Sequence, residues 1–248
     1  MRIYAIGDLH LSFRKTPVPG ERETFQEYKP MGEVNKAWTD HALQLYQNWQ
    51  KKVKSSDVVL IPGDISWAMR LPEAMTDLHF LDLLPGLKIC VQGNHDYWWQ
   101  SISKIRSVLP DSVRLIQNDH IRIGNLAVCG ARGWLCPNGA YFQEHDLKIY
   151  RRELIRLENS LQDVKSPAKE IIVLMHYMPT NEKHDYSGFI ELFQKYSVKK
   201  VVYGHIHAGA CRYRLPDCLW SISFYLVSAD YLNFAPKLIT CYSDELTC

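Results

Sequence analysis

The sequence has no hydrophobic run that approaches the ~20 residues needed to cross a membrane, and no marked excess of charge of either sign. Its 248 residues carry 29 basic and 27 acidic side chains, for a net charge of +2. This near-neutral balance argues against a nucleic-acid coat or a protein that binds membrane surfaces. The first expected strand begins at Met1, which leaves no room for a signal peptide. We therefore expect a soluble, cytoplasmic protein.

The sequence also has no Cys-x-x-Cys pair, and its seven cysteines are an odd number, so at least one thiol stays unpaired within the chain. Cys90 and Cys129 lie in apolar runs, where cysteine most often serves as a small buried residue. These features favour a reducing compartment. No linker, repeat or low-complexity tract interrupts the chain, which predicts one domain over residues 1–248.

What the sequence does contain is an alternation of strand-like and helix-like segments. Apolar runs typical of strands lie at 3–6, 58–62, 88–92, 113–116, 121–123, 126–130, 171–175 and 199–203. Helical spacing lies at 38–53, 71–81, 102–109, 147–161 and 187–196, with Ser187 as a cap of the last helix. The tail adds two antiparallel-type strands, 219–229 and 237–242. We predict an α/β fold in which two sheets pack face to face with helices outside.

A polar stretch from Ser12 to Asn35, rich in proline and glycine, follows the first strand. Loops of this length inside compact domains often act as lids or binding loops. The alternative is a surface insertion without a role. The stretch begins just after Asp8 and His10, which favours a functional loop as much as a surface insertion. Both interpretations stay open.

Five short motifs carry side chains that bind metals, and each follows a strand-like run. They are Gly7-Asp8-Leu9-His10, Gly63-Asp64, Gly93-Asn94-His95-Asp96, Met175-His176 and Gly204-His205-Ile206-His207. Strand ends of an α/β sheet lie side by side, so distant residues can meet at one cleft. The motifs therefore predict a site for two divalent metals. The glycines before them either allow close approach of substrate or only end the strands.

The spacing within the motifs suits paired ligands. Residues i and i+2 of a strand point to the same side, so Asp8 and His10 can bind one ion if the strand geometry persists. His205 and His207 can do the same. Mixed nitrogen and oxygen ligands suit manganese, iron or zinc better than calcium or magnesium. Without cysteine ligands, a closed structural zinc site is not expected.

The same motifs predict a reaction. A carboxylate such as Asp64 can bridge two ions, and Asn94 can offer its carbonyl oxygen to the second. Ions about 3.5–4 Å apart can share a hydroxide and clamp a phosphate, which predicts hydrolysis of phosphoesters through a metal-bridging hydroxide. His95 is the candidate that assists the leaving oxygen, with Asp96 orienting its ring. The alternative for His95 is a packing role.

Together the motifs resemble the calcineurin-like metallophosphoesterase superfamily over residues 7–207, and most closely its bacterial small phosphoesterase branch. The resemblance implies a four-layer αββα sandwich of two mixed β-sheets around a dinuclear centre. It implies that one metal is held by Asp8, His10, Asp64 and His207, and the other by Asp64, Asn94, His176 and His205. It also implies that His95 contacts the scissile phosphate, with Asp96 behind it.

One departure from the family narrows the range of expected substrates. Relatives that act on phosphoserine and phosphothreonine usually continue as Gly-Asp-x-x-Asp-Arg-Gly, but this sequence reads Gly63-Asp64-Ile65-Ser66-Trp67-Ala68. The missing arginine argues against a protein phosphatase. We expect a small phosphodiester or phosphomonoester, including nucleotides. The aromatic residues at 67, 97, 98, 99 and 134 either stack on a nucleobase or pack in the core.

Two alternatives remain at this point. One is a catalytically silent binding or scaffold protein on the same fold, which typically loses metal ligands or the Asn-His pair that this chain keeps. The other is a nuclease of the same superfamily. The near-neutral charge and the lack of a second domain argue against nucleic acid as a partner.

Overall fold

The structure, a computed structural model, describes residues 1–164, 168 and 170–242, and its strands form two sheets. The first contains β11 (Lys237–Cys241), β1 (Arg2–Ala5), β2 (Val58–Ile61), β3 (Leu87–Cys90) and β4 (Val113–Leu115), in that order. β1 to β4 are parallel, and β11 pairs antiparallel with β1 at one edge.

The second sheet has the order β5 (His120–Ile123), β6 (Leu126–Ala131), β7 (Glu170–Met175), β8 (Lys200–Tyr203), β10 (Ile222–Leu226) and β9 (Cys218–Leu219). Its four central strands are parallel, and the two edge strands are antiparallel to their neighbours. Both sheets are therefore mixed.

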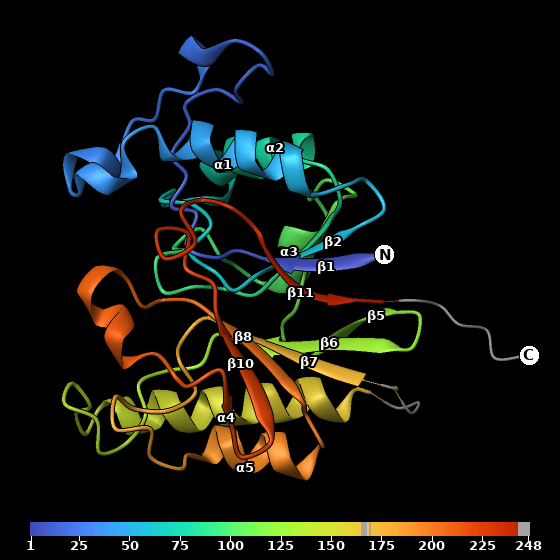
Figure 1. The fold of residues 1–248 in the computed structure, drawn as a ribbon, viewed down its shortest axis with the longest axis vertical. Helices are drawn as coiled ribbons and strands as arrows, with labels where there is room; N and C mark the ends of the chain where they lie inside the picture. Colours follow the sequence, from blue (N-terminus) through green and yellow to red (C-terminus); the bar gives the residue numbers. More distant parts are fainter. Residues whose placement is uncertain (165–167, 169, 243–248) are drawn as a thin grey trace, which may run out of the picture.

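Helices cover the outer faces of the two sheets, as Figure 1 shows. α1 (His41–Lys52), α2 (Leu71–Leu83) and α3 (Ile102–Arg106) share an apolar cluster with the first sheet, and α4 (Asp146–Gln162) and α5 (Gly188–Lys195) with the second. A third cluster fills the space between the sheets. The predicted four-layer αββα sandwich is confirmed.

The apolar runs of the sequence arise because the strands are covered on both faces. In β2, Val58 and Leu60 face the other sheet, whereas Val59 and Ile61 face the helices. This alternation follows from the two-residue period of a strand. In Figure 1, β1 runs away from the N-terminus toward the side where η4 (Ala208–Tyr213) lies. The carboxyl ends of the parallel strands thus bring the motif loops together at one edge.

Two helices differ from the sequence-based prediction, and one predicted helix cap is confirmed. The first helix begins at His41 instead of residue 38, because Asp40 has a left-handed φ of +53° and Trp38 belongs to a preceding turn, η3 (Lys36–Trp38). α3 ends at Arg106, short of the expected 109. Ser187 does cap α5, where its side chain accepts a hydrogen bond from the Ile190 N–H.

The tail was predicted as two antiparallel-type strands, which is wrong for the segment 219–229. Trp220 and Ser221 both have positive φ, which forms a two-residue hairpin turn between β9 and β10. β10 then runs parallel to β8. The chain next crosses to the other sheet, where β11 pairs with β1, so the tail strands complete both sheets.

The polar stretch 12–35 contains two short turns, η1 (Arg22–Thr24) and η2 (Met31–Glu33). Glu27 anchors it, because its Oε1 accepts the Ser12 N–H at 3.1 Å and its Oε2 lies 3.2 Å from His41 Nδ1. Whether the stretch acts as a lid stays a prediction.

Within the described ranges, none of the helices combines the length and the apolar character required of a membrane span.

Candidate metal centre

The candidate ligands lie in loops just beyond strand ends, and four of them have left-handed backbone conformations. The φ angles are +56° at Asp8, +48° at His10, +52° at Asp64 and +71° at His205. Asp, Asn and His tolerate this region better than most residues, and such strain is commonly kept at functional sites. The expectation that strand alternation pairs Asp8 with His10 is wrong in its mechanism. β1 ends at Ala5, and the loop conformation brings the two together.

Asp8, His10 and His207 form a first group, with one ligand atom of each within 4.8 Å of the others. Asp8 is fully buried, and its Oδ1 lies 3.6 Å from His207 Nε2. Both carboxylate oxygens accept the His205 N–H, at 3.0 Å each. Burial alone would raise the pKa of Asp8, but the hydrogen bond and charge of His207 lower it below the usual range. The group therefore presents a charged carboxylate.

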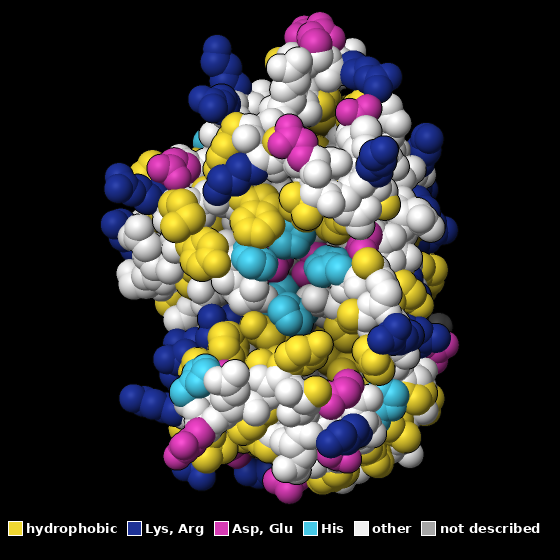
Figure 2. Space-filling model, turned by 90° about the vertical axis from the view of Figure 1, so that its left-hand side faces the viewer, with side chains coloured by type: hydrophobic (Ala, Val, Ile, Leu, Met, Phe, Trp, Pro, Cys, Tyr) yellow, Lys and Arg dark blue, Asp and Glu magenta, His cyan; other side chains and the backbone are white. Residues whose placement is uncertain are grey.

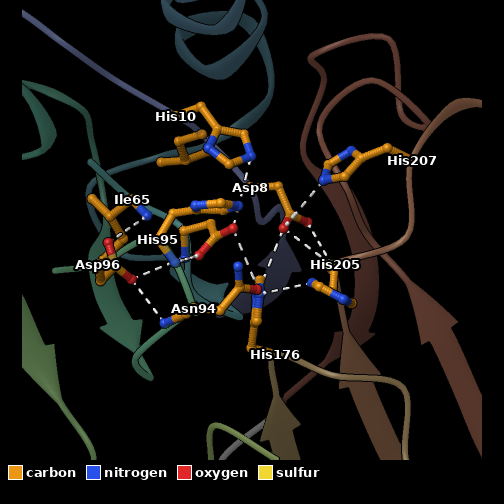
Figure 3. Close-up of polar contacts among 12 residues, drawn as sticks. Asp8, His10, Ile65, Asn94, His95, Asp96, His176, His205 and His207 are labelled. Carbon is orange, nitrogen blue, oxygen red and sulfur yellow. Dashed lines mark hydrogen bonds and ion pairs between the residues drawn. The ribbon is translucent and has the colours of Figure 1, made fainter. Parts of the chain in front are cut away.

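Asp64, Asn94, His176 and His205 form a second group, of which Figure 3 labels Asn94, His176 and His205. His176 Nε2 lies 2.6 Å from Asn94 Oδ1, 3.2 Å from His205 Nδ1 and 3.6 Å from Asp64 Oδ2. The other ring nitrogen, Nδ1, donates to the Pro62 carbonyl at 2.9 Å, which leaves a lone pair on Nε2 of the neutral ring. Hydrogen-bond acceptors thus face one another, an arrangement that a cation between them would stabilise.

Asp64 lies between the two groups. Its Oδ2 is 3.8 Å from His10 Nε2 and 3.6 Å from His176 Nε2. Burial and the charge of Asp8 raise the pKa of Asp64 to about 8, because two carboxylates in one buried site do not ionise together easily. Bound cations would remove that penalty. Asp64 therefore lies within 3.8 Å of a candidate ligand of each group.

The imidazole rings are mostly held neutral. Burial lowers the pKa of His10 and of His205 to about 3, and it also lowers the pKa of His176. Neutral rings present the lone pairs that metal binding requires. His207 differs: burial opposes its charge, but hydrogen bonds to Asp230 and Asp8 raise its pKa to about 10.

Asp230 is a supporting residue that the sequence analysis missed. His207 Nδ1 donates to Asp230 Oδ1 at 2.8 Å, and the Ala208 N–H donates to Oδ2 at 3.0 Å. These bonds direct His207 Nε2 toward Asp8. A carboxylate in this position commonly orients a metal-binding histidine. Asp230 follows β10, and no spacing in the sequence connects it to His207.

Two of the glycines bring backbone close to the carboxylates. A Cβ at Gly93 would overlap Asp64 Oδ1, and a Cβ at Gly204 would overlap Asp8 Oδ2. Close approach is therefore needed here for packing of the candidate ligands against the loops, and close approach of substrate stays a prediction.

His95 lies beside the second group and is half-buried. Its backbone N–H donates to Asp64 Oδ1 at 2.8 Å, and its buried Nδ1 has no partner among the described residues. The Trp67 ring lies 4.5 Å from the His95 ring and stacks on His10 at 4.8 Å. Trp67 thus packs against both His10 and His95, whose own rings lie 5.7 Å apart, and it occupies the sequence position where protein phosphatases carry their second aspartate.

The prediction that Asp96 orients the His95 ring is wrong. The Asp96 carboxylate is buried and points to the backbone of the neighbouring loop (Figure 3). It accepts hydrogen bonds from the N–H groups of Asp64, Ile65, Ser66 and Gly93 and from Trp98 Nε1. The physical reason is that this loop leaves several amide donors unpaired, and one carboxylate satisfies them. Asp96 therefore supports the loop that carries Asp64.

The other aromatic residues divide between core and site. Trp98 is buried, and Trp99 donates to Gln117 at 2.7 Å, so both pack within the fold. Tyr97 is 55% exposed beside His95. Trp38, which the sequence analysis placed only on a helix face, lies against the rings of His10 and His207 at 5.6 and 5.7 Å.

The residues present fit divalent metals. The buried carboxylates, the neutral imidazoles and the Asn94 oxygen make a mixed oxygen and nitrogen donor set suited to first-row transition metals. Figure 2 shows histidine side chains around a hollow with acidic side chains in its depth. Hydrophobic side chains border this hollow, and the lysine and arginine side chains lie farther from it.

Comparisons with known proteins identify a family. A family model described as calcineurin-like phosphoesterase matches residues 1–209. One similar solved structure is a protein of unknown function, AQ665, from Aquifex aeolicus, with 15% identity, a TM-score of 0.49, and coverage of 96% of this chain and 95% of that one. Another is GAP50, described as the anchor in the inner membrane complex of Plasmodium, with 13% identity, a TM-score of 0.50, and coverage of 93% and 72%. GAP50 shares the fold alone. No curated protein matches the chain.

Proposed function

Because the chain belongs to the calcineurin-like phosphoesterase family, we propose that it hydrolyses a phosphoester bond in a small substrate with two divalent metal ions. The resemblance of its motifs to that family is thereby confirmed. The observation that carries the proposal is the convergence of acceptor atoms around His176 Nε2, which lies within 3.6 Å of Asn94, His205 and Asp64.

We assign the ligands by these contacts and by motif position. Asp8, His10, Asp64 and His207 hold one ion, and Asp64, Asn94, His176 and His205 hold the other. Asp8 Oδ1 also lies 3.7 Å from His176 Nδ1, but that nitrogen donates to Pro62 and has no lone pair to offer. Asp8 therefore belongs with His10 and His207. Manganese, iron or zinc suits this donor set.

The chemistry divides between the ions and the protein. Ions held there would activate water for attack on phosphorus and offset charge on the phosphate oxygens. The water oxygen bonds to phosphorus, the ester P–O bond breaks, and the alcohol oxygen leaves with its electron pair and takes up the proton that water lost. His95 would donate a hydrogen bond to that oxygen, while Asp230 and Asp96 would hold the site without touching substrate.

The substrate proposed is a small phosphodiester or phosphomonoester, with nucleotides among the candidates. A phosphoprotein is disfavoured, because Trp67 and Ala68 stand where protein phosphatases carry their aspartate and arginine.

The test is turnover of p-nitrophenyl phosphate and bis-p-nitrophenyl phosphate by protein reconstituted with Mn²⁺, Fe²⁺ or Zn²⁺. His95→Ala should lower turnover by roughly 10²–10⁴-fold with metal content nearly intact. His79→Ala, at an exposed position of α2, is the matched control and should act as wild type. Metal binding without turnover of either ester would favour a scaffold, and plasmid nicking would favour a nuclease. Equal loss of metal in His95→Ala would make His95 a ligand.

We also propose that residues 1–248 act as one domain. Residues beyond 209 provide β10 to the second sheet and β11 to the first, and Asp230 supports His207. Truncation after residue 209 should therefore prevent folding, measured by circular dichroism. A truncated chain with a cooperative thermal transition would contradict a single domain.

A further inference from the structure

An apolar cavity of about 440 Å³ opens beside the candidate metal centre. His205 and His207 form one of its walls, so it is continuous with both groups of candidate ligands. The remaining walls come from two separate segments and from η4. They are lined mainly by apolar and aromatic side chains, among them Leu135, Phe142, Met178, Ala210 and Tyr213.

Two polar side chains of this cavity, those of Asn181 and Thr180, are occupied by the protein itself. Asn181 donates to the Pro137 carbonyl and to Asp185, and its oxygen accepts the N–H groups of Lys183 and Asp185. Thr180 donates to the Asn181 carbonyl.

Glu182 is the acidic side chain among the described lining residues. One of its oxygens is also engaged, because Oε1 accepts the Ala140 N–H at 2.9 Å. No lysine or arginine is among the lining residues that the structure describes. The cavity therefore offers little to a charged or strongly polar ligand, and burying such a group there without partners would be costly.

The size and position of the cavity indicate which kind of chemical group it binds. Small-molecule sites commonly have volumes of roughly 300–1,000 Å³ with mostly apolar walls, and a phosphoryl group alone needs far less space. A phosphoryl group at the ligands would lie next to His205 and His207, with its ester substituent able to enter the cavity. We infer that this cavity binds an uncharged, apolar organic group of the phosphoester substrate, hydrocarbon or aryl. The inference rests on the proposed phosphoesterase function.

The experiment measures binding instead of turnover. Isothermal titration of manganese-loaded protein is carried out with methylphosphonate, butylphosphonate and 4-phosphonobutyrate, whose P–C bonds resist hydrolysis. Each buried methylene is worth about fourfold in affinity, so butylphosphonate should bind at least tenfold tighter than methylphosphonate. The added carboxylate of 4-phosphonobutyrate should remove that gain.

Two paired variants test whether the gain in affinity for butylphosphonate arises in the cavity. Ala210→Glu, which puts a carboxylate into the wall formed by η4, should reduce the butyl-to-methyl affinity ratio severalfold. Gly209→Glu adds the same charge one residue away, where a Cβ meets no atom within 4 Å and the cavity is not lined, and it should keep the wild-type ratio. Thermal melts check that both variants fold. If either variant fails to fold, the phosphonate series measured on the wild-type protein still tests the inference.

Two outcomes would overturn the inference. If methylphosphonate binds but butylphosphonate binds no tighter, the cavity does not receive the organic group, and the phosphoesterase proposal stands. If no phosphonate binds while metals do, the proposed phosphate site fails and the cavity inference fails with it.

Discussion

His176 and Asn94 face each other with Nε2 and Oδ1 only 2.6 Å apart, while the opposite nitrogen of His176 donates to the Pro62 carbonyl. With Nδ1 protonated, the neutral ring directs a lone pair at an amide oxygen that also carries lone pairs. A cation held by both atoms makes this arrangement favourable, and metal removal should leave them in repulsion.

Asn94→Ala should therefore lower the bound metal from two ions toward one per chain, because the second ion loses an oxygen ligand while the first group keeps all of its own. The measurement is elemental analysis of manganese-reconstituted protein after gel filtration. Asn159→Ala, at an exposed position of α4, is the matched control. Retention of two ions by the Asn94 variant would remove it from the ligand set.

Asp230→Asn should weaken metal binding by roughly 10–100-fold, the usual range for loss of a carboxylate behind a metal-binding histidine. The reason is the 2.8 Å contact between Asp230 Oδ1 and His207 Nδ1, which holds the ring and increases its basicity. Competition with a chromophoric chelator measures the affinity. Asp217→Asn, at an exposed ion pair with Arg214, should have no effect, and equal affinities for both variants would show that Asp230 is dispensable.

Asp96→Asn should act on stability. The substitution turns one acceptor oxygen into an amide that faces buried N–H donors, at a cost of about 3 kcal/mol or more. For a chain of this size that is a fall in Tm of roughly 6–12 °C. Thermal melts beside the exposed control Asp111→Asn measure it. An unchanged Tm together with lost turnover would instead restore the role of orienting His95.

Glu27, within the 12–35 stretch, and His41 form a buried contact, with Oε2 and Nδ1 at 3.2 Å. Burial raises the pKa of Glu27 to about 8 and lowers the pKa of His41 to about 4. In the unfolded chain these groups titrate near about 4.3 and 6.5. Between pH ~4.3 and ~6.5, the Glu27–His41 pair holds one proton in both the folded and the unfolded chain. Above pH ~6.5 only the folded chain keeps it, so stability falls as pH rises to about 8.

The Glu27–His41 pair should accordingly contribute a loss of about 2 kcal/mol of unfolding free energy between pH 6.5 and 8, or roughly 4–8 °C in Tm. Glu27→Gln, whose amide can donate to His41 without titrating, should lose clearly less. Melts in EDTA at several pH values measure this without a contribution from metal binding. Glu23→Gln, an exposed change in the same stretch, should follow the wild type. Parallel curves for the Glu27 variant and the wild type would contradict the assignment.

Much of the site was predictable because its candidate ligands occur in short sequence motifs. Asp8, Asp64, Asn94 and His176 follow apolar runs, and parallel strands covered on both faces necessarily end at a common edge. What failed was reasoning about single side chains. Asp96 stands next to His95 in sequence, yet it pairs with backbone N–H groups of a different loop, which no local pattern indicates.

The sequence by itself determined the fold class, the family and the identity of the candidate ligands, because strand periodicity and the spacing of polar residues after strands are local properties of the chain. Only the tertiary structure decided that Asp230 supports His207, that Trp67 packs against both His10 and His95, and that an apolar cavity adjoins His205. Those relationships depend on where loops from different strands meet in space. They are decided by the packing of the two sheets and by left-handed turns at individual residues, and neither has a fixed spacing along the chain.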